Sequence, residues 1–251
     1  MHRLLLTLSL CLFGISASAQ SFSDMSPDER TAFGEAVRAY ILENPELVME
    51  AVAILQNREQ LAAVEADREL AARYQSHLTD DGYSFVGGNP DGAITLVEFI
   101  DYRCGYCRQA HDEIRALVAA NDDIRYIVKE FPILGDESVL AARAALAVLV
   151  NDGDETYHEL NDLLMKFAGP INETTLLELA AQAGADGMRM AGIMDSPLIT
   201  EMISNNRALA QRMQITGTPT FVLGGEMVRG YVSPDVMNAL LEDAREAAEA
   251  L

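Results

Sequence analysis

Positive charge is scarce in this chain. Its 251 residues include 18 Lys and Arg against 39 Asp and Glu, which gives a net charge of −21 at neutral pH. A surface of this sign repels the phosphates of nucleic acids and the headgroups of anionic lipids. We therefore expect no nucleic-acid partner.

Long apolar runs are also scarce. The run at residues 4–15 is too short to span a bilayer, and small residues stand at positions −3 and −1 of a cleavage site before Gln20. We expect residues 1–19 to be a cleaved signal peptide. Its loss removes one Arg, so the exported, mature protein is expected to have a net charge of −22. An uncleaved anchor is one alternative. Lipidation of Cys11 is another, but Leu10 is bulkier than the residue that a lipoprotein signal carries there.

Cysteine is the third scarce residue. The chain has three, and loss of the signal peptide leaves Cys104 and Cys107. A cysteine pair in an oxidising compartment is usually a structural disulfide. The stabilisation that a disulfide gives grows with the loop that it closes, and this loop is nearly the shortest that a chain can form. The pair therefore points to redox chemistry or metal binding rather than to a structural role.

Apolar periodicity and turn residues predict an α/β protein. Helices are expected after the capping residue Ser26, from residue 45 to about 74, after Cys104, over most of residues 136–212 and after Ser233. Strands are expected at residues 83–86, 94–100, 124–131, 220–223 and 227–232. The helix that follows Cys104 connects two strands as a crossover, which makes those strands parallel. The sequence thus predicts a sheet flanked by helices.

The helical arm at residues 20–78 needs a partner for its apolar face. Leu47, Ile54 and Leu61 recur every seven residues, although charged residues interrupt the stripe. The arm either packs on its own domain or associates with other copies of the chain. The second case predicts a homo-oligomer, a dimer or a trimer.

The strand-to-helix junction gives the dithiol its expected chemistry. It places Cys104 at a helix N-terminus, where unpaired backbone N–H groups and the helix dipole favour an anion. The thiolate is the reactive form of cysteine, so we expect the pKa of Cys104 to lie below its ordinary value. Cys107 lies one turn later on the core face. We expect Cys104 to attack a substrate disulfide and Cys107 to resolve the mixed disulfide.

Glu98 is the single charged residue in the otherwise apolar strand at residues 94–100. Burial of a lone carboxylate raises its pKa. Six residues before Cys104, this group is expected to lie beneath Cys107 and to relay the proton that Cys107 must lose. We expect Lys129, in the adjacent strand, to be its charge partner. The alternative is an internal ion pair with no catalytic task.

Several stretches resemble the DsbA-type periplasmic thiol–disulfide oxidoreductases. Residues 96–107 look like the strand and dithiol of that family, residues 216–221 (Thr-Gly-Thr-Pro-Thr-Phe) are similar to its cis-proline loop, and residues 129–135 also resemble it. Asn44-Pro45 and the helix after it resemble the N-terminal extension of the ScsC subgroup, which is linked to suppression of copper sensitivity. The resemblance extends over roughly residues 30–250.

The resemblance implies a thioredoxin fold at residues 79–251 with an inserted helical domain at about residues 136–205. It also implies that Pro219 is cis and faces the dithiol, and that Thr218 presents backbone groups to a bound substrate. No cofactor is implied. The expected substrates are disulfide-containing exported proteins, and the expected redox partner is a membrane protein.

The residues between the cysteines depart from the DsbA pattern. That family's oxidases carry Pro-His there, whereas this chain has Gly105-Tyr106. A histidine would help to hold the thiolate and make the disulfide a stronger oxidant. Gly-Tyr resembles the disulfide isomerases and ScsC-like proteins instead. We therefore expect isomerase or reductase activity rather than oxidase activity, with Gly105, Tyr106 and Thr218 in contact with substrate.

Two other functions compete with thiol–disulfide exchange. Two thiolates one helical turn apart can bind Cu(I) or Zn²⁺, and His111 is a candidate further ligand, although it is more readily explained as an exposed helix residue. His77 and His158 form no recognisable metal motif, and no further cysteine completes a structural zinc site. The other alternative is a structural helical-arm protein with an inert disulfide. Glu98 and the Thr-Pro loop argue against it.

Overall fold

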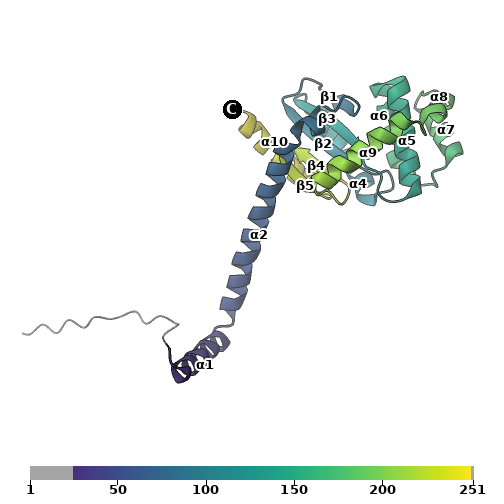
Figure 1. The fold of residues 1–251 in the computed structure, drawn as a ribbon. Coiled ribbons are helices and arrows are strands. Elements are labelled where there is room, and N and C mark those ends of the chain that lie inside the picture. The colour runs from purple at the N-terminus through teal and green to yellow at the C-terminus, as the bar shows by residue number, and fades with distance from the viewer. Residues whose placement is uncertain (1–24, 250–251) are drawn as a thin grey trace, which may run out of the picture. The chain divides into compact units, whose positions relative to one another are not determined.

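A computed structural model describes residues 25–249 of the chain (Figure 1). The expected signal peptide and Cys11 lie outside this range. The described residues divide into two compact units between Glu59 and Gln60. The predicted domain boundaries at residues 19 and 78 stay predictions.

The first unit is helical. Helix α1 (Pro27–Glu43) begins at the predicted capping box, in which the Ser26 N–H donates to the Glu29 carboxylate at 2.8 Å and the Glu29 N–H donates to the Ser26 hydroxyl at 3.3 Å. Helix α2 (Glu46–Arg73) continues into the second unit. Neither the described part of α1 nor that of α2 buries an apolar face, since Ala71 is the one buried residue of the two helices.

The second unit contains a five-stranded sheet in the order β1-β3-β2-β4-β5 (Figure 1). Its strands are β1 (Phe85–Gly88), β2 (Ile94–Ile100), β3 (Ile124–Glu130), β4 (Thr220–Leu223) and β5 (Glu226–Arg229). Strands β2 and β3 are parallel, as predicted, and the other pairs are antiparallel.

Two edge strands differ from their predicted ranges, each for a local reason. Strand β1 starts after Ser84, because the N–H groups of Tyr83 and Ser84 donate to the Asp81 carboxylate and form a turn. Strand β5 ends at Arg229, because Gly230 has a φ of 85°, which belongs to the left-handed region and breaks the ladder.

Helices cover both faces of the sheet, so β2 is buried on each side as its apolar sequence predicts. On one face Leu96 and Ile100 pack with α4 (Gly105–Ala120) and α10 (Pro234–Glu249). On the other face Val97 and Phe99 pack with the end of α2, with α3 (Gln75–Thr79) and with α9 (Pro197–Arg212). The predicted sheet flanked by helices is confirmed.

The segment between β3 and β4 is helical. It contains α5 (Asp136–Asp152), α6 (Asp154–Lys166), α7 (Glu173–Gln182), α8 (Gly187–Ile193) and α9. Figure 1 shows α5 to α8 grouped beside the sheet. The last turns of α9 pack against the sheet. The Asn206 side chain donates to the Glu130 carbonyl at 3.1 Å, and Leu209 lies in the core beneath β2. Helix α9 thus joins the insertion to the sheet.

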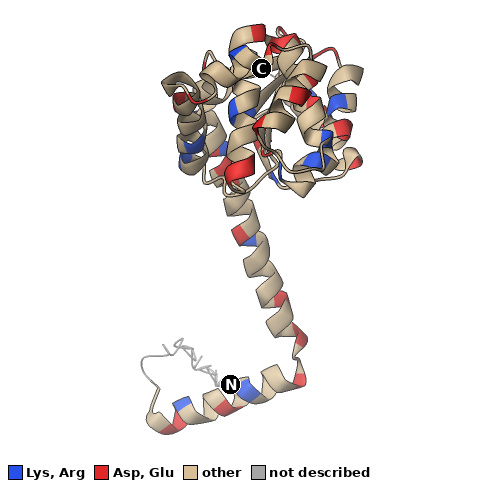
Figure 2. Cartoon of the chain, turned by 90° about the vertical axis from the view of Figure 1, so that its right-hand side faces the viewer, with Lys and Arg blue, Asp and Glu red and all other residues tan. Residues whose placement is uncertain are grey.

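Acidic side chains outnumber basic ones in both units (Figure 2). Over residues 25–249, none of the helices combines the length and the apolar character that crossing a membrane requires.

Candidate active site

The dithiol lies at the start of α4. Cys104 is the N-cap of this helix and has an extended backbone, with φ −77° and ψ 117°. Its carbonyl accepts the first helical hydrogen bond, from the Arg108 N–H at 3.1 Å. Both cysteines are free thiols; Cys104 is 7% exposed and Cys107 is 0% exposed. The predicted strand–dithiol–helix arrangement is confirmed.

The two thiols have opposite acidities. The hydrogen bond from the Cys107 side chain, with help from the Thr218 side chain and the N–H groups of Cys107 and Tyr106, lowers the pKa of Cys104 to about 5 despite its burial. Burial, the bond to Cys104 and the Glu98 charge raise the pKa of Cys107. At neutral pH Cys104 is therefore the thiolate and Cys107 keeps its proton.

The loop before β4 faces Cys104. The Thr218–Pro219 peptide bond is cis, as the resemblance implies. The carbonyl of Thr218 lies 3.1 Å from Cys104 Sγ. The Thr220 hydroxyl donates to the Gly217 carbonyl at 2.9 Å and closes the turn. A backbone acceptor beside the reactive sulfur is suited to hold a substrate strand there.

Glu98 lies in strand β2, and it is buried, with 3% of its surface exposed. Burial raises the pKa of its carboxyl to about 7, although the hydrogen bond from the Tyr126 hydroxyl opposes the rise. The Glu98 charge contributes to the raised pKa of Cys107, and the Cys104 charge to that of Glu98, so the carboxyl lies within electrostatic reach of both thiols. The sequence did not predict Tyr126 as its partner.

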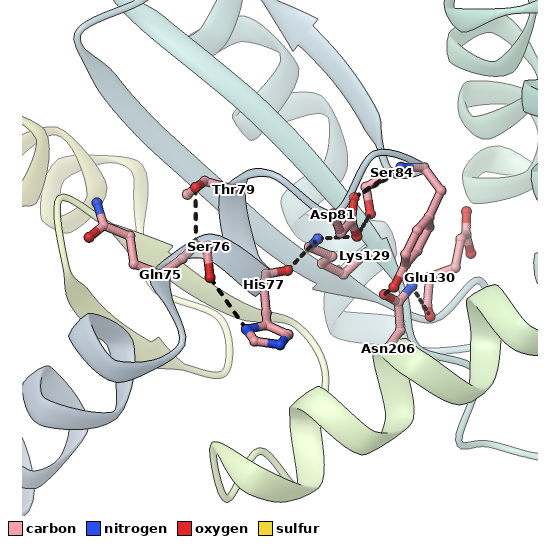
Figure 3. Close-up of polar contacts among 10 residues, drawn as sticks. Gln75, Ser76, His77, Thr79, Asp81, Ser84, Lys129, Glu130 and Asn206 are labelled. Carbon is pink, nitrogen blue, oxygen red and sulfur yellow. Dashed lines mark hydrogen bonds and ion pairs between the residues drawn. The ribbon is translucent and has the colours of Figure 1, made fainter.

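Lys129 is not the partner of Glu98, so that prediction is wrong. Its ammonium donates to the Asp81 carboxylate at 2.5 Å and to the His77 carbonyl at 3.0 Å (Figure 3). The pleat of the sheet explains why Lys129 does not reach Glu98. Glu98 is in register with Val128, so Lys129, one residue further on, points to the opposite face of the sheet.

The residues between the cysteines have open surroundings. A side chain at Gly105 would meet no atom within 4 Å. Tyr106 is 62% exposed and stacks on Tyr231, with ring centroids 6.5 Å apart and an angle of 19° between the planes. The Tyr231 hydroxyl donates to Glu113 at 3.2 Å. The rings of Tyr106 and Tyr231 therefore form an aromatic surface next to the dithiol.

Asp101 is a site residue that sequence reasoning missed. Its carboxylate is 1% exposed and accepts from the N–H groups of Arg103, Ile133 and Leu134, at 2.8, 2.7 and 3.0 Å. It thereby holds the segment before Cys104 against the loop after β3. Its position directly after a buried strand was the available signal.

Two arginines tie the dithiol to the insertion. Arg103 donates to the Gly169 carbonyl at 3.1 Å, and Arg108 donates to the Met165 carbonyl at 2.8 Å, near the end of α6. Sequence reasoning missed both, because the partner carbonyls lie more than fifty residues away and leave no local pattern.

His111 is 7% exposed, so the expectation of an exposed helix residue is wrong. Its Nε2 lies 3.0 Å from the Asp162 carboxylate. With Asp112, these residues form the one cluster within residues 25–249 that has the spacing of metal ligands. The Lys166 ammonium lies between the two carboxylates, at 2.8 Å from Asp162 and 3.1 Å from Asp112, and supplies the positive charge there.

Comparison with protein families gives two matches. Residues 95–242 match the DSBA-like thioredoxin domain, and residues 29–62 match the copper resistance protein ScsC N-terminal domain. The first match covers more than half of the chain and agrees with the α/β thioredoxin-type fold and the helical insertion, and the second falls on helices α1 and α2.

Two solved structures agree with this assignment, and a curated relative matches over part of its own length. A thioredoxin-like oxidoreductase from Silicibacter pomeroyi is 38% identical, with a TM-score of 0.64 over 68% of this chain and 97% of its own. A periplasmic thioredoxin-like protein from Salmonella enterica is 28% identical, with a TM-score of 0.59 over 68% of this chain and 94% of its own. A Na⁺/H⁺ antiporter NhaA of Herminiimonas arsenicoxydans is 31% identical over 66% of this chain and 26% of its own length. The chain spans about a quarter of the length of the first curated relatives that it matches.

Proposed function

The chain belongs to the family of DSBA-like thioredoxin domains, and from this we propose that it is a thiol–disulfide oxidoreductase whose reactive dithiol is Cys104 and Cys107. One observation carries the proposal. A thiol of lowered pKa at a helix N-terminus lies 3.1 Å from the Thr218 carbonyl, with a buried second thiol one turn behind it.

The reaction begins at Cys104. Its thiolate attacks one sulfur of a substrate disulfide, so a Cys104–substrate bond forms, the substrate S–S bond breaks and the other substrate sulfur leaves as a thiolate. The Thr218 carbonyl and the cis-Pro219 turn hold the substrate backbone beside the sulfur. Gly105 leaves room for the substrate, and Tyr106 offers it an aromatic contact.

Resolution uses Cys107. Its proton passes to the Glu98 carboxylate. Because the pKa of Glu98 is raised to about 7, this carboxylate can accept a proton near neutral pH. The Cys107 thiolate then attacks Cys104 Sγ and releases the second substrate thiolate. The substrate has gained two electrons, and the enzyme has lost two and holds a Cys104–Cys107 disulfide. In isomerisation a different substrate thiolate attacks first and releases Cys104 unchanged.

The direction of exchange is a finer proposal. The Gly105-Tyr106 spacer supports isomerase or reductase activity, with the dithiol kept reduced by a membrane partner. The lowered pKa of Cys104 supports the second candidate, a dithiol oxidase, because a stabilised thiolate makes the disulfide more oxidising. Trapping the thiols in cells with an alkylating reagent separates the two. A mostly reduced pool indicates isomerase or reductase activity, and a mostly oxidised pool indicates an oxidase.

We place this activity in the periplasm, on exported proteins with disulfides. The signal-like residues 1–19 support the location. We also propose that the arm at residues 20–78 joins copies of the chain into a dimer or trimer. The exposed apolar side chains of α1 and α2 support this, because such a face is normally covered.

The test of the main proposal is reactivation of scrambled ribonuclease and reduction of insulin. Cys104→Ala is expected to abolish both activities, and retention of either would contradict the proposal. The match to the ScsC N-terminal domain favours copper binding as an alternative task of the same thiols. In that case the reduced protein takes up one Cu(I) in competition with a chelator, while wild type and Cys104→Ala show equally little exchange.

A further inference from the structure

Arg229, the last residue of β5, joins two distant parts of the chain. Its Nε and Nη2 donate to the two carboxylate oxygens of Asp67 in α2, at 3.0 and 2.6 Å. Its Nη1 donates to the Gln214 carbonyl at 2.7 Å, and Nη2 also donates to the Met213 carbonyl at 3.3 Å. One guanidinium therefore connects α2 to the segment that leads into the loop at residues 216–219.

That segment has a backbone conformation that needs support. Gln214 has a φ of 55°, in the left-handed region that residues with a side chain rarely adopt. Arg229 holds the carbonyl of this residue. At the other end of the loop, the Gly230 N–H donates to the Pro219 carbonyl at 2.9 Å, and Thr220 pairs with Arg229 in the sheet. Arg229 and Gly230 thus make contacts at both ends of the loop.

The loop between these two ends faces the dithiol. It presents the Thr218 carbonyl at 3.1 Å from Cys104 Sγ, and with Arg229 it lines a cavity of about 140 Å³. We propose that Arg229, oriented by Asp67, is a positioning residue that fixes this loop against Cys104. The proposal rests on the proposed thiol–disulfide exchange, because it assigns the loop to substrate binding.

The guanidinium is suited to this task in a way that an ammonium is not. Its planar fork makes two parallel bonds to one carboxylate and directs its remaining donors at fixed angles. The pair is partly exposed, at 38% for Arg229 and 20% for Asp67, so it contributes little to stability. Loss of the pair is therefore expected to move the loop without unfolding the protein.

A neighbouring ion pair provides the control. Arg68, one residue after Asp67, pairs with Glu226 at the start of β5. This pair joins the same helix to the same strand but bonds to no atom of residues 213–219. Glu226→Gln removes an anchor of α2 and leaves the loop contacts intact, whereas Asp67→Asn and Arg229→Lys disturb the contacts of Arg229.

The experiment uses the full reduced protein. We expect Asp67→Asn and Arg229→Lys to lower kcat/KM for scrambled ribonuclease by about tenfold or more, mainly through a higher KM, as expected when a binding group is misplaced. We also expect the pKa of Cys104, followed by thiolate absorbance, to rise in both, because the Thr218 side chain helps to lower it. Glu226→Gln is expected to stay within about twofold of wild type in both measurements.

Two results would overturn the proposal. One is an unchanged kcat/KM and Cys104 pKa in Asp67→Asn and Arg229→Lys. The other is an equal loss in Glu226→Gln, which would assign the effect to anchoring of α2. The thiolate titration does not require enzymatic turnover. A shifted pKa in a protein without exchange activity would thus reject the proposed function and retain the loop contact, so the two failures are distinguishable.

Discussion

The variant Glu98→Gln tests two predictions about the buried carboxyl group: that it makes stability depend on pH and that it accepts the proton of Cys107. Burial raises the pKa of the Glu98 carboxyl from 4.5 to about 7. Between these values the folded protein holds a proton that the unfolded chain releases. Stability from this group is fully present below pH 4.5 and is lost as the pH rises through 7. The size of the shift corresponds to about 3 kcal/mol of unfolding free energy.

The assay is urea unfolding of the reduced protein at pH 5 and pH 8. Glutamine keeps an acceptor for the Tyr126 hydroxyl but does not titrate. We expect the stability of wild type relative to Glu98→Gln to fall by about 2–3 kcal/mol between the two pH values. Glu130, whose pKa burial raises to about 8, titrates in both proteins and cancels in this difference.

The same variant tests the proton relay. Loss of a general base typically slows a step by about a hundredfold or more. We expect release of a mixed disulfide by Cys107 to slow by this amount in Glu98→Gln and to lose its inflection near pH 7, whereas alkylation of Cys104 stays fast. An identical pH dependence of stability in wild type and Glu98→Gln would refute the claim that burial raises the pKa of Glu98. An unchanged rate of release would refute the relay.

Three further predictions follow from other parts of the molecule. Asp81→Asn leaves the buried Lys129 ammonium without its counter-charge and is expected to lower the unfolding free energy by about 3 kcal/mol or more. Asp80→Asn is the control, and an equal effect of the two changes in urea unfolding would contradict this prediction. Replacement of Leu47, Ile54 and Leu61 by Lys is expected to reduce the mass measured by light scattering to that of one chain with exchange activity retained, and an unchanged mass would reject self-association through this stripe. The reduced dithiol is expected to bind one Cu(I) and the alkylated protein none; equal uptake by both would place copper elsewhere.

Much of the fold was predictable because its signals are local. The apolar sequence of β2 predicted a strand buried on both faces, and the strand has the predicted bounds Ile94–Ile100. The capping box at Ser26 predicted the start of α1. The edge strands were predicted less well, because their limits depend on Asp81 and Gly230, whose turn geometry the apolar pattern does not contain.

The candidate site was predictable in its parts but not in its contacts. The dithiol, Glu98 and the Thr-Pro loop are each visible as local motifs. Lys129 was assigned to the wrong partner, because the face on which a side chain lies depends on strand register as well as on proximity in sequence. Tyr126 was missed, because a tyrosine in a strand has no distinctive pattern until its partner is known.

The sequence by itself determined the chemistry of this protein, since two thiols three residues apart at a strand-to-helix junction, followed by a Thr-Pro loop, define a dithiol site and its family. Only the tertiary structure decided which groups tune that site. It brought the Thr218 carbonyl to Cys104 across more than a hundred residues, set Tyr126 against Glu98, and connected α2 through Arg229 to the segment that leads into the loop. These contacts depend on register and packing between distant elements, and no local pattern in the chain encodes them.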